Sequence, residues 1–157
     1  MSIAVFDIDG VVADVRHRVH FVERRPRDWG RFFAAAAADA LSEVGAGWAK
    51  RAAADHDLVW LTGRPERLRA VTVRWLGQHG LPAGRLLMRA DQDYRPAREY
   101  KVAELRRIAG RDQIAVFVDD DPAVIEAAAA AGFTASLATW LPRGQALAQA
   151  QERAGRT

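Results

Sequence analysis

The chain of 157 residues contains no cysteine, which excludes disulfide bonds, thiolate metal ligands and a cysteine nucleophile. It also has no run of about 18 apolar residues, the length that a membrane-spanning helix requires. No signal peptide is expected at the start, because Asp7 and Asp9 interrupt any apolar region there. Half of the residues are hydrophobic, as in an ordinary globular domain. We therefore expect a cytoplasmic protein with no membrane partner and no thiol chemistry.

Lysine is scarce, since only Lys50 and Lys101 occur among the 23 basic residues. The arginines are scattered along the chain, so the net charge of +3 is only a weak indication of a nucleic-acid partner. An ammonium group is a compact point charge, whereas a guanidinium is a planar fork. A lysine that is kept among so many arginines marks a position where a point charge is needed.

Short apolar runs alternate with helical patterns along most of the chain. The predicted strands cover residues 3–6, 58–61, 86–88, 114–118 and 134–137, and the predicted helices cover residues 65–79, 99–109 and 122–131. Strands that alternate with helices of this length favour a parallel sheet with right-handed crossovers. The predicted fold class is therefore α/β, a three-layer sandwich around a Rossmann-like parallel sheet.

The connection between the first two strands is long. More than forty residues follow Val12 before the second strand, whereas a plain crossover needs far fewer. Residues 15–47 are predicted to form a small helical cap over the end of the first strand, before a crossover helix near residues 48–54. A single domain is predicted over residues 1–142, and a polar tail, helical or frayed, over residues 143–157.

Polar side chains follow the predicted strands at the edge where ligands bind in an open α/β sheet. Two aspartates, two positions apart in extended chain, follow the first strand and project to the same side. A Thr-Gly-Arg segment follows the second strand, and acidic residues follow the fourth. The candidate site residues are Asp7, Asp9, Thr62, Gly63, Arg64, Lys101, Asp119 and Asp120.

The residue types in this set suit a magnesium ion and a phosphate. Several carboxylates without His or Cys at ligand spacing favour a hard cation such as Mg²⁺. The Thr62 hydroxyl, the Gly63 amide and the Lys101 ammonium are groups that bind phosphoryl oxygens. An aspartate carboxylate is also able to accept a phosphoryl group. The sequence therefore predicts a magnesium-dependent site for a phosphorylated substrate.

The order of these motifs resembles the haloacid dehalogenase superfamily of phosphohydrolases, over residues 3–133. The resemblance implies that Asp7 is the nucleophile and a metal ligand. Asp9 would protonate the leaving oxygen and then activate water, with its backbone carbonyl on the metal. Superfamily members that cleave carbon–halogen bonds generally lack an acid at this position, so phosphoryl transfer is expected. Receiver domains use similar residues, but their phosphoryl-accepting Asp lies mid-chain and their adjacent paired acids follow the first strand. In this chain the pair Asp119-Asp120 is late and Lys101 precedes it, which disfavours a receiver domain.

The same resemblance assigns the other residues. Thr62 would bind the transferring phosphoryl group, together with Gly63 and Arg64. Lys101 would neutralise Asp7 and the phosphoryl charge. The Mg²⁺ site would be completed, directly or through water, by Asp119 and Asp120. Arg64 has a second interpretation, in which it only pairs with the acidic residues and holds their loop.

Three segments, residues 6–10, 61–66 and 118–121, resemble the phosphatase domain of polynucleotide kinase, which removes 3′-phosphates from nucleic-acid ends. The glycine-rich phosphate loop of a kinase is missing from the chain. Residues 9–14 also resemble the 5′(3′)-deoxyribonucleotidases. Val11 and Asp121 depart from the pattern, because Thr and Arg are usual there. A nucleic-acid end or a nucleotide is the expected substrate; a deoxyribonucleotidase-like enzyme and a non-catalytic binding module are the alternatives.

The predicted cap holds further candidates. His17 and His20, with neighbouring arginines, either line a substrate entrance or form a solvated surface. An aromatic group around residues 29–33 either stacks on a base or packs internally, and packing is the commoner outcome. The cap is too short for a large lid, so the crevice is expected to stay open, as a site for chain ends would require.

Overall fold

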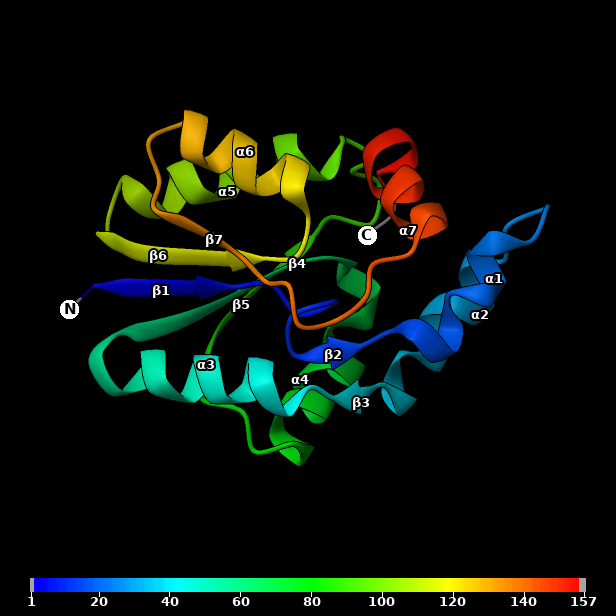
Figure 1. The fold of residues 1–157 in the computed structure, drawn as a ribbon, viewed down its shortest axis with the longest axis horizontal. Coiled ribbons are helices and arrows are strands. Elements are labelled where there is room, and N and C mark those ends of the chain that lie inside the picture. Colours follow the sequence, from blue (N-terminus) through cyan, green and yellow to red (C-terminus); the bar gives the residue numbers. More distant parts are fainter. Residues whose placement is uncertain (1, 156–157) are drawn as a thin grey trace.

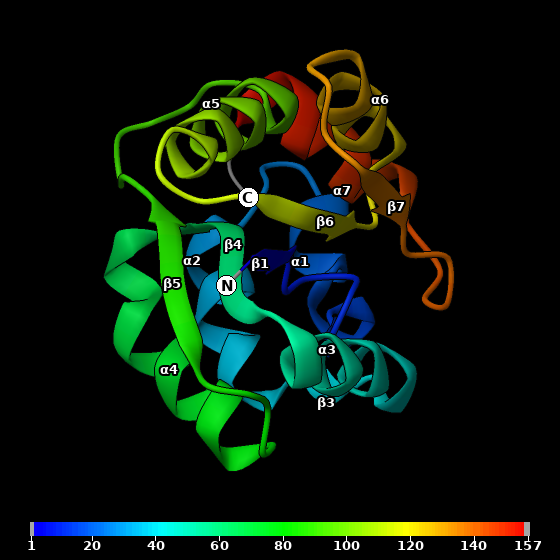
Figure 2. The same cartoon turned by 90° about the vertical axis from the view of Figure 1, so that its left-hand side faces the viewer.

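The protein is built on a five-stranded parallel sheet with the strand order β5-β4-β1-β6-β7. The computed structural model describes residues 2–155, except the side chains of residues 146, 153 and 154. Figures 1 and 2 show the sheet from its side and from its end. The strands are β1 (Ile3–Phe6), β4 (Asp57–Pro65), β5 (Gly84–Arg89), β6 (Ile114–Asp119) and β7 (Ala135–Leu137).

Helices cover both faces of the sheet, which gives three layers (Figure 1). Alternate side chains of β1 point to opposite faces. Ala4 and Phe6 belong to the core under α3 and α4, whereas Ile3 and Val5 belong to the core under α5 and α6. The helices are α3 (Glu43–Asp55), α4 (Arg69–Gln78), α5 (Ala97–Ala109) and α6 (Pro122–Ala130). The predicted α/β three-layer fold is therefore confirmed.

The predicted strands are all present, and the differences lie at their ends. β4 runs on to Pro65, beyond the predicted end at residue 61, because its pairing with β5 continues past an irregularity after Thr62. The predicted helix that follows starts at Arg69, after a 3₁₀ turn over Glu66–Leu68. At α6 the expected cap is present, since the Asp121 carboxylate accepts a hydrogen bond of 2.9 Å from the Ala123 amide.

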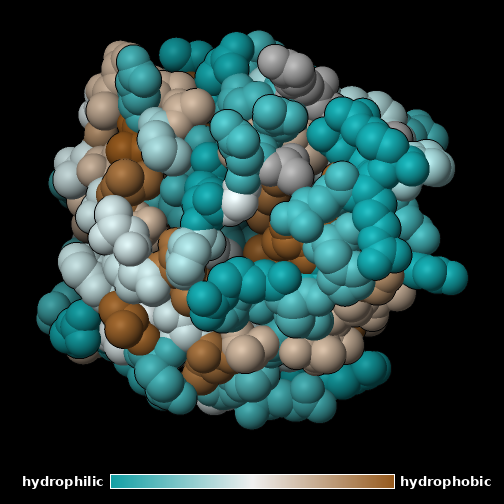
Figure 3. Space-filling model, turned by 45° about the vertical axis from the view of Figure 1, so that its right-hand side comes forward, coloured by the Kyte–Doolittle hydropathy of each residue, from teal (hydrophilic) through white to brown (hydrophobic). Residues whose placement is uncertain are grey.

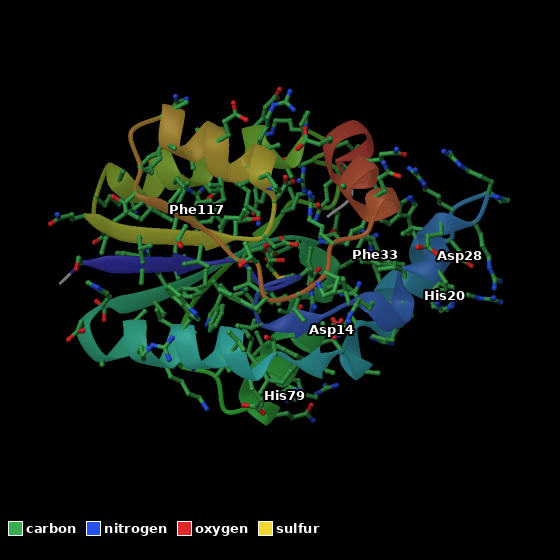
Figure 4. The ribbon with its side chains drawn as sticks, viewed as in Figure 1. Asp14, His20, Asp28, Phe33, His79 and Phe117 are labelled. Carbon is green, nitrogen blue, oxygen red and sulfur yellow. The ribbon has the colours of Figure 1, made fainter. Side chains whose placement is uncertain are left out.

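The insertion after β1 is a small cap at the carboxyl edge of the sheet. It holds an antiparallel pair of two-residue strands, two short helices and two 3₁₀ turns. Its own core joins valines to Phe32 and Phe33; Figure 4 labels Phe33 in the cap and Phe117 in β6. Its elements are β2 (Ala13–Asp14), Arg16–Arg18, α1 (His20–Glu23), α2 (Trp29–Ala34), Ala35–Ala38 and β3 (Ala40–Leu41).

The cap ends earlier than the sequence predicts. The crossover helix α3 begins at Glu43, with Ser42 as its N-cap, so residues 43–47 belong to the helix and not to the cap. Gly45 is needed inside this helix because a Cβ there would lie 1.8 Å from the backbone oxygen of Val11. This glycine therefore allows a close approach between the helix and the loop after β1.

Residues 143–155 adopt the helical form of the two that were predicted for the tail. They form α7 (Gln145–Gln149) and a π-helical turn (Ala150–Ala154), and both fold back over the carboxyl edge of the sheet (Figure 1). Leu147 is buried with the valines and aromatic residues of the cap. No helix in residues 2–155 is long and apolar enough to cross a lipid bilayer.

Candidate active site

Three buried charges meet where β1 and β6 end side by side. Asp7 follows β1, Asp119 is the last residue of β6, and Lys101 reaches them from the first half of α5. The ammonium nitrogen of Lys101 lies 2.9 Å from Asp7 Oδ1 and 2.7 Å from Asp119 Oδ2. Burial opposes the charge on Lys101, but Asp119 and Asp7 outweigh this effect and raise its pKa. The lysine therefore stays charged and partly neutralises the two acids.

A group of three carboxylates is large enough and close enough to hold a cation. One oxygen from each of Asp7, Asp119 and Asp120 lies within 4.8 Å of the other two. Asp120 Oδ1 is buried, and no described residue gives it a hydrogen bond. Hard divalent cations take carboxylate oxygens of this kind as ligands. The residues present therefore fit a divalent cation such as Mg²⁺.

The electrostatics of this group point the same way. Burial, followed by the charges of Asp119 and Asp9, raises the pKa of Asp7 to about 7, although Lys101 lowers it. Burial also raises the pKa of Asp120 well above its usual value, and Asp119 and Asp7 add to this. Carboxylates that repel each other in a buried place bind a proton or a metal ion more readily. Gly10 makes room for the group, because a Cβ at its φ of +80° would lie 2.0 Å from Asp120 Oδ2.

Two arginines bind the second aspartate of the first motif. Arg64 donates to Asp9 Oδ1 from Nη2 at 2.7 Å and from Nε at 3.0 Å, and Arg18 Nη2 lies 3.3 Å from the same oxygen. Burial raises the pKa of Asp9, but Arg64 and then Arg18 more than reverse this and lower it to about 2. Of the two interpretations of Arg64, the structure supports the one in which this arginine pairs with an acidic residue, Asp9.

Asp39, in the cap, holds both arginines and was not predicted from the sequence. Its carboxylate accepts hydrogen bonds from Arg18 at 2.8 Å and from Arg64 at 2.9 Å, and it lies 2.7 Å from a ring nitrogen of His17. Its backbone oxygen accepts a bond of 2.8 Å from the indole of Trp75. No local pattern marks an aspartate after a run of alanines. Only the folded cap shows that it joins the arginines.

The other cap candidates divide clearly. His17 contacts Asp39 and so belongs to the edge of the site. His20, labelled on the cap in Figure 4, is exposed, and its ring packs against Phe21. The aromatic residues pack internally, since Phe32 is fully buried and Phe33 is 4% exposed. The packing interpretation of this aromatic group is therefore correct.

A narrow pocket lies in front of Asp7. Thr62 accepts a hydrogen bond of 3.1 Å from the Arg64 amide, which leaves its own hydroxyl hydrogen free to donate. The cavity has a volume of only about 10 Å³. Its polar lining consists of Asp7, Asp9, Thr62, Gly63, Lys101, Asp119, Asp121 and Gln151. The expectation of an open crevice is therefore wrong, because residues 143–155 cover the edge that the cap leaves free.

All eight predicted site residues come together in one connected set. Asp7, Asp119, Asp120 and Lys101 form one group, the ion pair of Asp9 and Arg64 lies beside the cap, and Thr62 and Gly63 line the pocket next to Asp7 and Asp9. The residues that the sequence did not predict are Asp39, Gln151 and Arg143. Arg143 lies 3.0 Å from Asp121 Oδ2, so an arginine from the C-terminal segment offsets the unusual acid at position 121.

Comparisons with known proteins identify the family of the chain. The sequence profile of the family "Polynucleotide kinase PNKP phosphatase domain" matches residues 1–136. No curated protein matches the chain. A chain in the structure of the Pnkp1/Rnl/Hen1 RNA repair complex is 22% identical with a TM-score of 0.72, over 90% of this chain and 43% of its own length. In a second structure of the Pnkp1/Rnl/Hen1 complex the values are the same, except that 47% of that chain is covered.

A third structure has the same fold at a lower identity. A haloacid dehalogenase-like family hydrolase from Streptococcus pneumoniae has a TM-score of 0.64 at 11% identity, over 94% of this chain and 89% of its own length. This chain spans less than half the length of the two Pnkp1/Rnl/Hen1 chains. The structures share the fold, and the profile match over residues 1–136 defines the family. The chain belongs to the family of the polynucleotide kinase PNKP phosphatase domain, within the haloacid dehalogenase superfamily, and is a phosphatase by class.

Proposed function

We propose that the chain is a Mg²⁺-dependent phosphomonoester hydrolase that acts through an aspartyl-phosphate on Asp7. The observation that carries the proposal is the position of Asp7 in a buried pocket, 2.9 Å from Lys101 and within reach of two further carboxylates. A carboxylate in this setting is held in one orientation and loses its hydration shell. The pocket also offers a hydroxyl, an ammonium and a backbone amide to phosphoryl oxygens.

In the first half-reaction, a carboxylate oxygen of Asp7 attacks phosphorus and the bond from phosphorus to the leaving oxygen breaks. The Lys101 ammonium and the Thr62 hydroxyl stabilise the charge on the phosphoryl oxygens. Asp9 gives a proton to the leaving oxygen. Arg64 and Arg18 lower the pKa of Asp9 in the free enzyme. An anionic phosphoryl group beside Asp9 raises this pKa, both by its own charge and because it attracts the two arginines.

In the second half-reaction, water attacks phosphorus of the aspartyl-phosphate and Asp9 takes the proton of this water. The bond from phosphorus to the Asp7 oxygen breaks, which releases inorganic phosphate and the Asp7 carboxylate. Arg64, Arg18 and Asp39 hold the Asp9 side chain in place during both proton transfers.

The metal ligands of this proposal are the side chains of Asp7, Asp119 and Asp120 and the backbone carbonyl of Asp9. A bound Mg²⁺ would supply positive charge that favours the carboxylate form of Asp7 and offsets the charge of the phosphoryl group. The raised pKa values of Asp7 and Asp120 support this assignment, because both acids lack sufficient positive charge from the protein alone.

We further propose a nucleic-acid 3′-phosphate end as the substrate. Two observations support this choice: the family to which the chain belongs, and the likeness in fold to chains of an RNA repair complex. A nucleotide is the main competing substrate. The neighbouring nucleotides of a chain end carry phosphates, so binding to arginines near the site would weaken with salt.

Loss of activity in the Asp7→Asn variant tests the mechanism. We expect this variant, and the wild-type protein in EDTA, to lose turnover of p-nitrophenyl phosphate. Asp57→Asn is a matched control, because Asp57 is exposed at the opposite end of β4 from Thr62. Turnover by Asp7→Asn at the wild-type rate would refute the nucleophile, and a phosphate panel without any turnover would favour the binding module.

A salt series tests the substrate. The measurement compares a 3′-phosphorylated oligonucleotide with the corresponding 3′-mononucleotide at 50 and 200 mM salt. We expect kcat/KM to fall with salt for the oligonucleotide and to change little for the mononucleotide. Equal values for both substrates, without a salt effect, would exclude the nucleic-acid end.

A further inference from the structure

The C-terminal segment of residues 143–155 lies on the catalytic edge, although its composition is that of a polar tail. Leu147 is 5% exposed and packs into the core of the cap, and Ala150 is fully buried. The following turn contacts α5, the helix that carries Lys101. The segment therefore spans the distance between the cap and α5 and crosses the site between them (Figure 1).

Gln151 brings this segment into the phosphoryl pocket. Its side chain is buried and lines the cavity together with Asp7, Thr62 and Lys101. At about 10 Å³ the cavity has room for roughly one water molecule. A phosphoryl group, with three oxygens around phosphorus, needs more space than this. The substrate therefore enters only if one wall moves, and Gln151 belongs to the one wall that does not come from the sheet or its crossover helices.

Polar contacts hold this wall at two places. Arg143 hydrogen-bonds Gln151 and lies 3.0 Å from Asp121 Oδ2, and its Nε lies 3.6 Å from Asp120 Oδ2 without the alignment of a hydrogen bond. Farther along, Arg98 pairs with Glu152, and the Arg98 side chain is 47% exposed. Exposed ion pairs contribute at most about 1 kcal/mol, because water and salt screen them.

Unfilled space lies beside the first part of the segment. A cavity of about 260 Å³ is lined by residues 141–147 on one side and by residues 14–23 of the cap on the other, and it reaches Gly10 and Asp120. The outer surface around this end of the molecule is largely hydrophilic, as Figure 3 shows. Weak contacts and incomplete packing are the features of segments that open locally at low cost.

We propose that residues 143–155 form a mobile cover of the phosphoryl pocket, which opens to admit the substrate, and that Gln151 contacts the phosphoryl group when the cover closes. An amide side chain has two N–H donors, and Arg143 engages only the oxygen of this one. The closed cover excludes water from the site, which strengthens the electrostatic interactions there. The assignment of Gln151 rests on the proposed phosphatase function, whereas the movement of the cover is measurable without it.

A disulfide clamp tests the movement. A Cβ at Gly144 would lie 3.8 Å from a γ-methyl carbon of Val19 in the cap, so cysteine side chains at these two positions would be neighbours. The chain has no other cysteine, so a Val19→Cys/Gly144→Cys variant forms one defined bond. We expect the oxidised form to lose at least about tenfold in turnover of p-nitrophenyl phosphate and to recover it with a reductant. Equal turnover by both forms would overturn the cover.

Thiol labelling measures opening without catalysis. A Gln151→Cys variant should react with a maleimide at least about tenfold more slowly than Gln78→Cys, which lies on the exposed surface of α4, and the clamp should slow it further. Equal rates at positions 151 and 78, or no effect of the clamp on position 151, would overturn the cover. If neither the wild-type protein nor any variant hydrolyses a phosphate, the phosphatase proposal fails. The labelling rates still show whether residues 143–155 open and close as proposed.

A pair of alanine variants tests the contact. We expect Gln151→Ala to lower kcat/KM by about tenfold, the effect of losing one hydrogen bond to a charged group. Gln149→Ala is the matched control, because Gln149 is exposed on the same segment. A kcat/KM for Gln151→Ala equal to that of Gln149→Ala would overturn the assignment of Gln151.

Discussion

Asp7 is costly to stability in the absence of a cation, so replacing it should stabilise the protein at high pH. Burial and two neighbouring acids raise its pKa from the usual 3.8 to about 7. The native state then binds the proton more tightly than the unfolded chain, and the free energy of unfolding falls as pH rises through this range. Asparagine carries no charge at any pH in the range, and it removes this dependence.

The expected magnitude follows from the same pKa. The pKa of Asp7 is 3.8 in the unfolded chain and about 7 in the folded protein, and about two units of this interval lie between pH 5 and pH 7. Each unit corresponds to about 1.4 kcal/mol. The stabilisation of Asp7→Asn relative to the wild type should therefore grow by about 2–3 kcal/mol from pH 5 to pH 8. Residues that a reaction needs often lower stability in this way.

The assay is urea denaturation of both proteins in EDTA at pH 5 and pH 8, with Asp57→Asn as the control. Saturating Mg²⁺ at pH 8 should stabilise the wild type by about 3 kcal/mol at a hundred times its dissociation constant. The Asp7→Asn variant should lose most of this gain. If the free energy of unfolding depended on pH in the same way in the wild type and in Asp7→Asn, the claim that Asp7 is a buried acid with a raised pKa would be refuted.

Two further pairs of substitutions test the structure. Lys101→Met should lower kcat by about 10²–10³ and destabilise the fold by about 3–5 kcal/mol, because it leaves two buried carboxylates without their partner. Lys50 is exposed, so Lys50→Ala should change the free energy of unfolding by less than about 0.5 kcal/mol. Similar activity losses in both variants would contradict the assignment of Lys101. Gly45→Ala should destabilise by about 1–3 kcal/mol, because its Cβ meets the Val11 backbone. Gly77→Ala, with open space around it in α4, should stabilise by about 0.5–1 kcal/mol in thermal or urea denaturation.

The sheet and its catalytic edge could be predicted because their signals are local. Each strand is a short apolar run that ends in turn residues, and the order of the motifs follows the order of the strands. Asp7, Thr62 and Asp119 could therefore be assigned to one edge before any contact was known. The start of α3 at Glu43 was not predicted, and the need for Gly45 inside this helix follows only from its contact with Val11.

The rest of the site depends on contacts between distant parts of the chain. Asp39 joins arginines that are 21 and 25 positions away in sequence. Gln151 comes from a segment whose composition favours a solvated tail, and its burial depends on Leu147 entering the core of the cap. Neither residue has neighbours in sequence that mark it. Their places follow from the packing of the cap and the C-terminal segment, which no single pattern records.

Chemical trapping of the intermediate tests the central claim most directly. With p-nitrophenyl phosphate, whose leaving group needs no acid, an Asp9→Asn variant should complete the first half-reaction and stall before hydrolysis. The account predicts a burst of one equivalent of p-nitrophenol, and borohydride reduction should then convert Asp7 to homoserine, as peptide mass spectrometry detects. Steady turnover without a burst, or a reduced residue anywhere other than position 7, would contradict catalysis through an aspartyl-phosphate on Asp7.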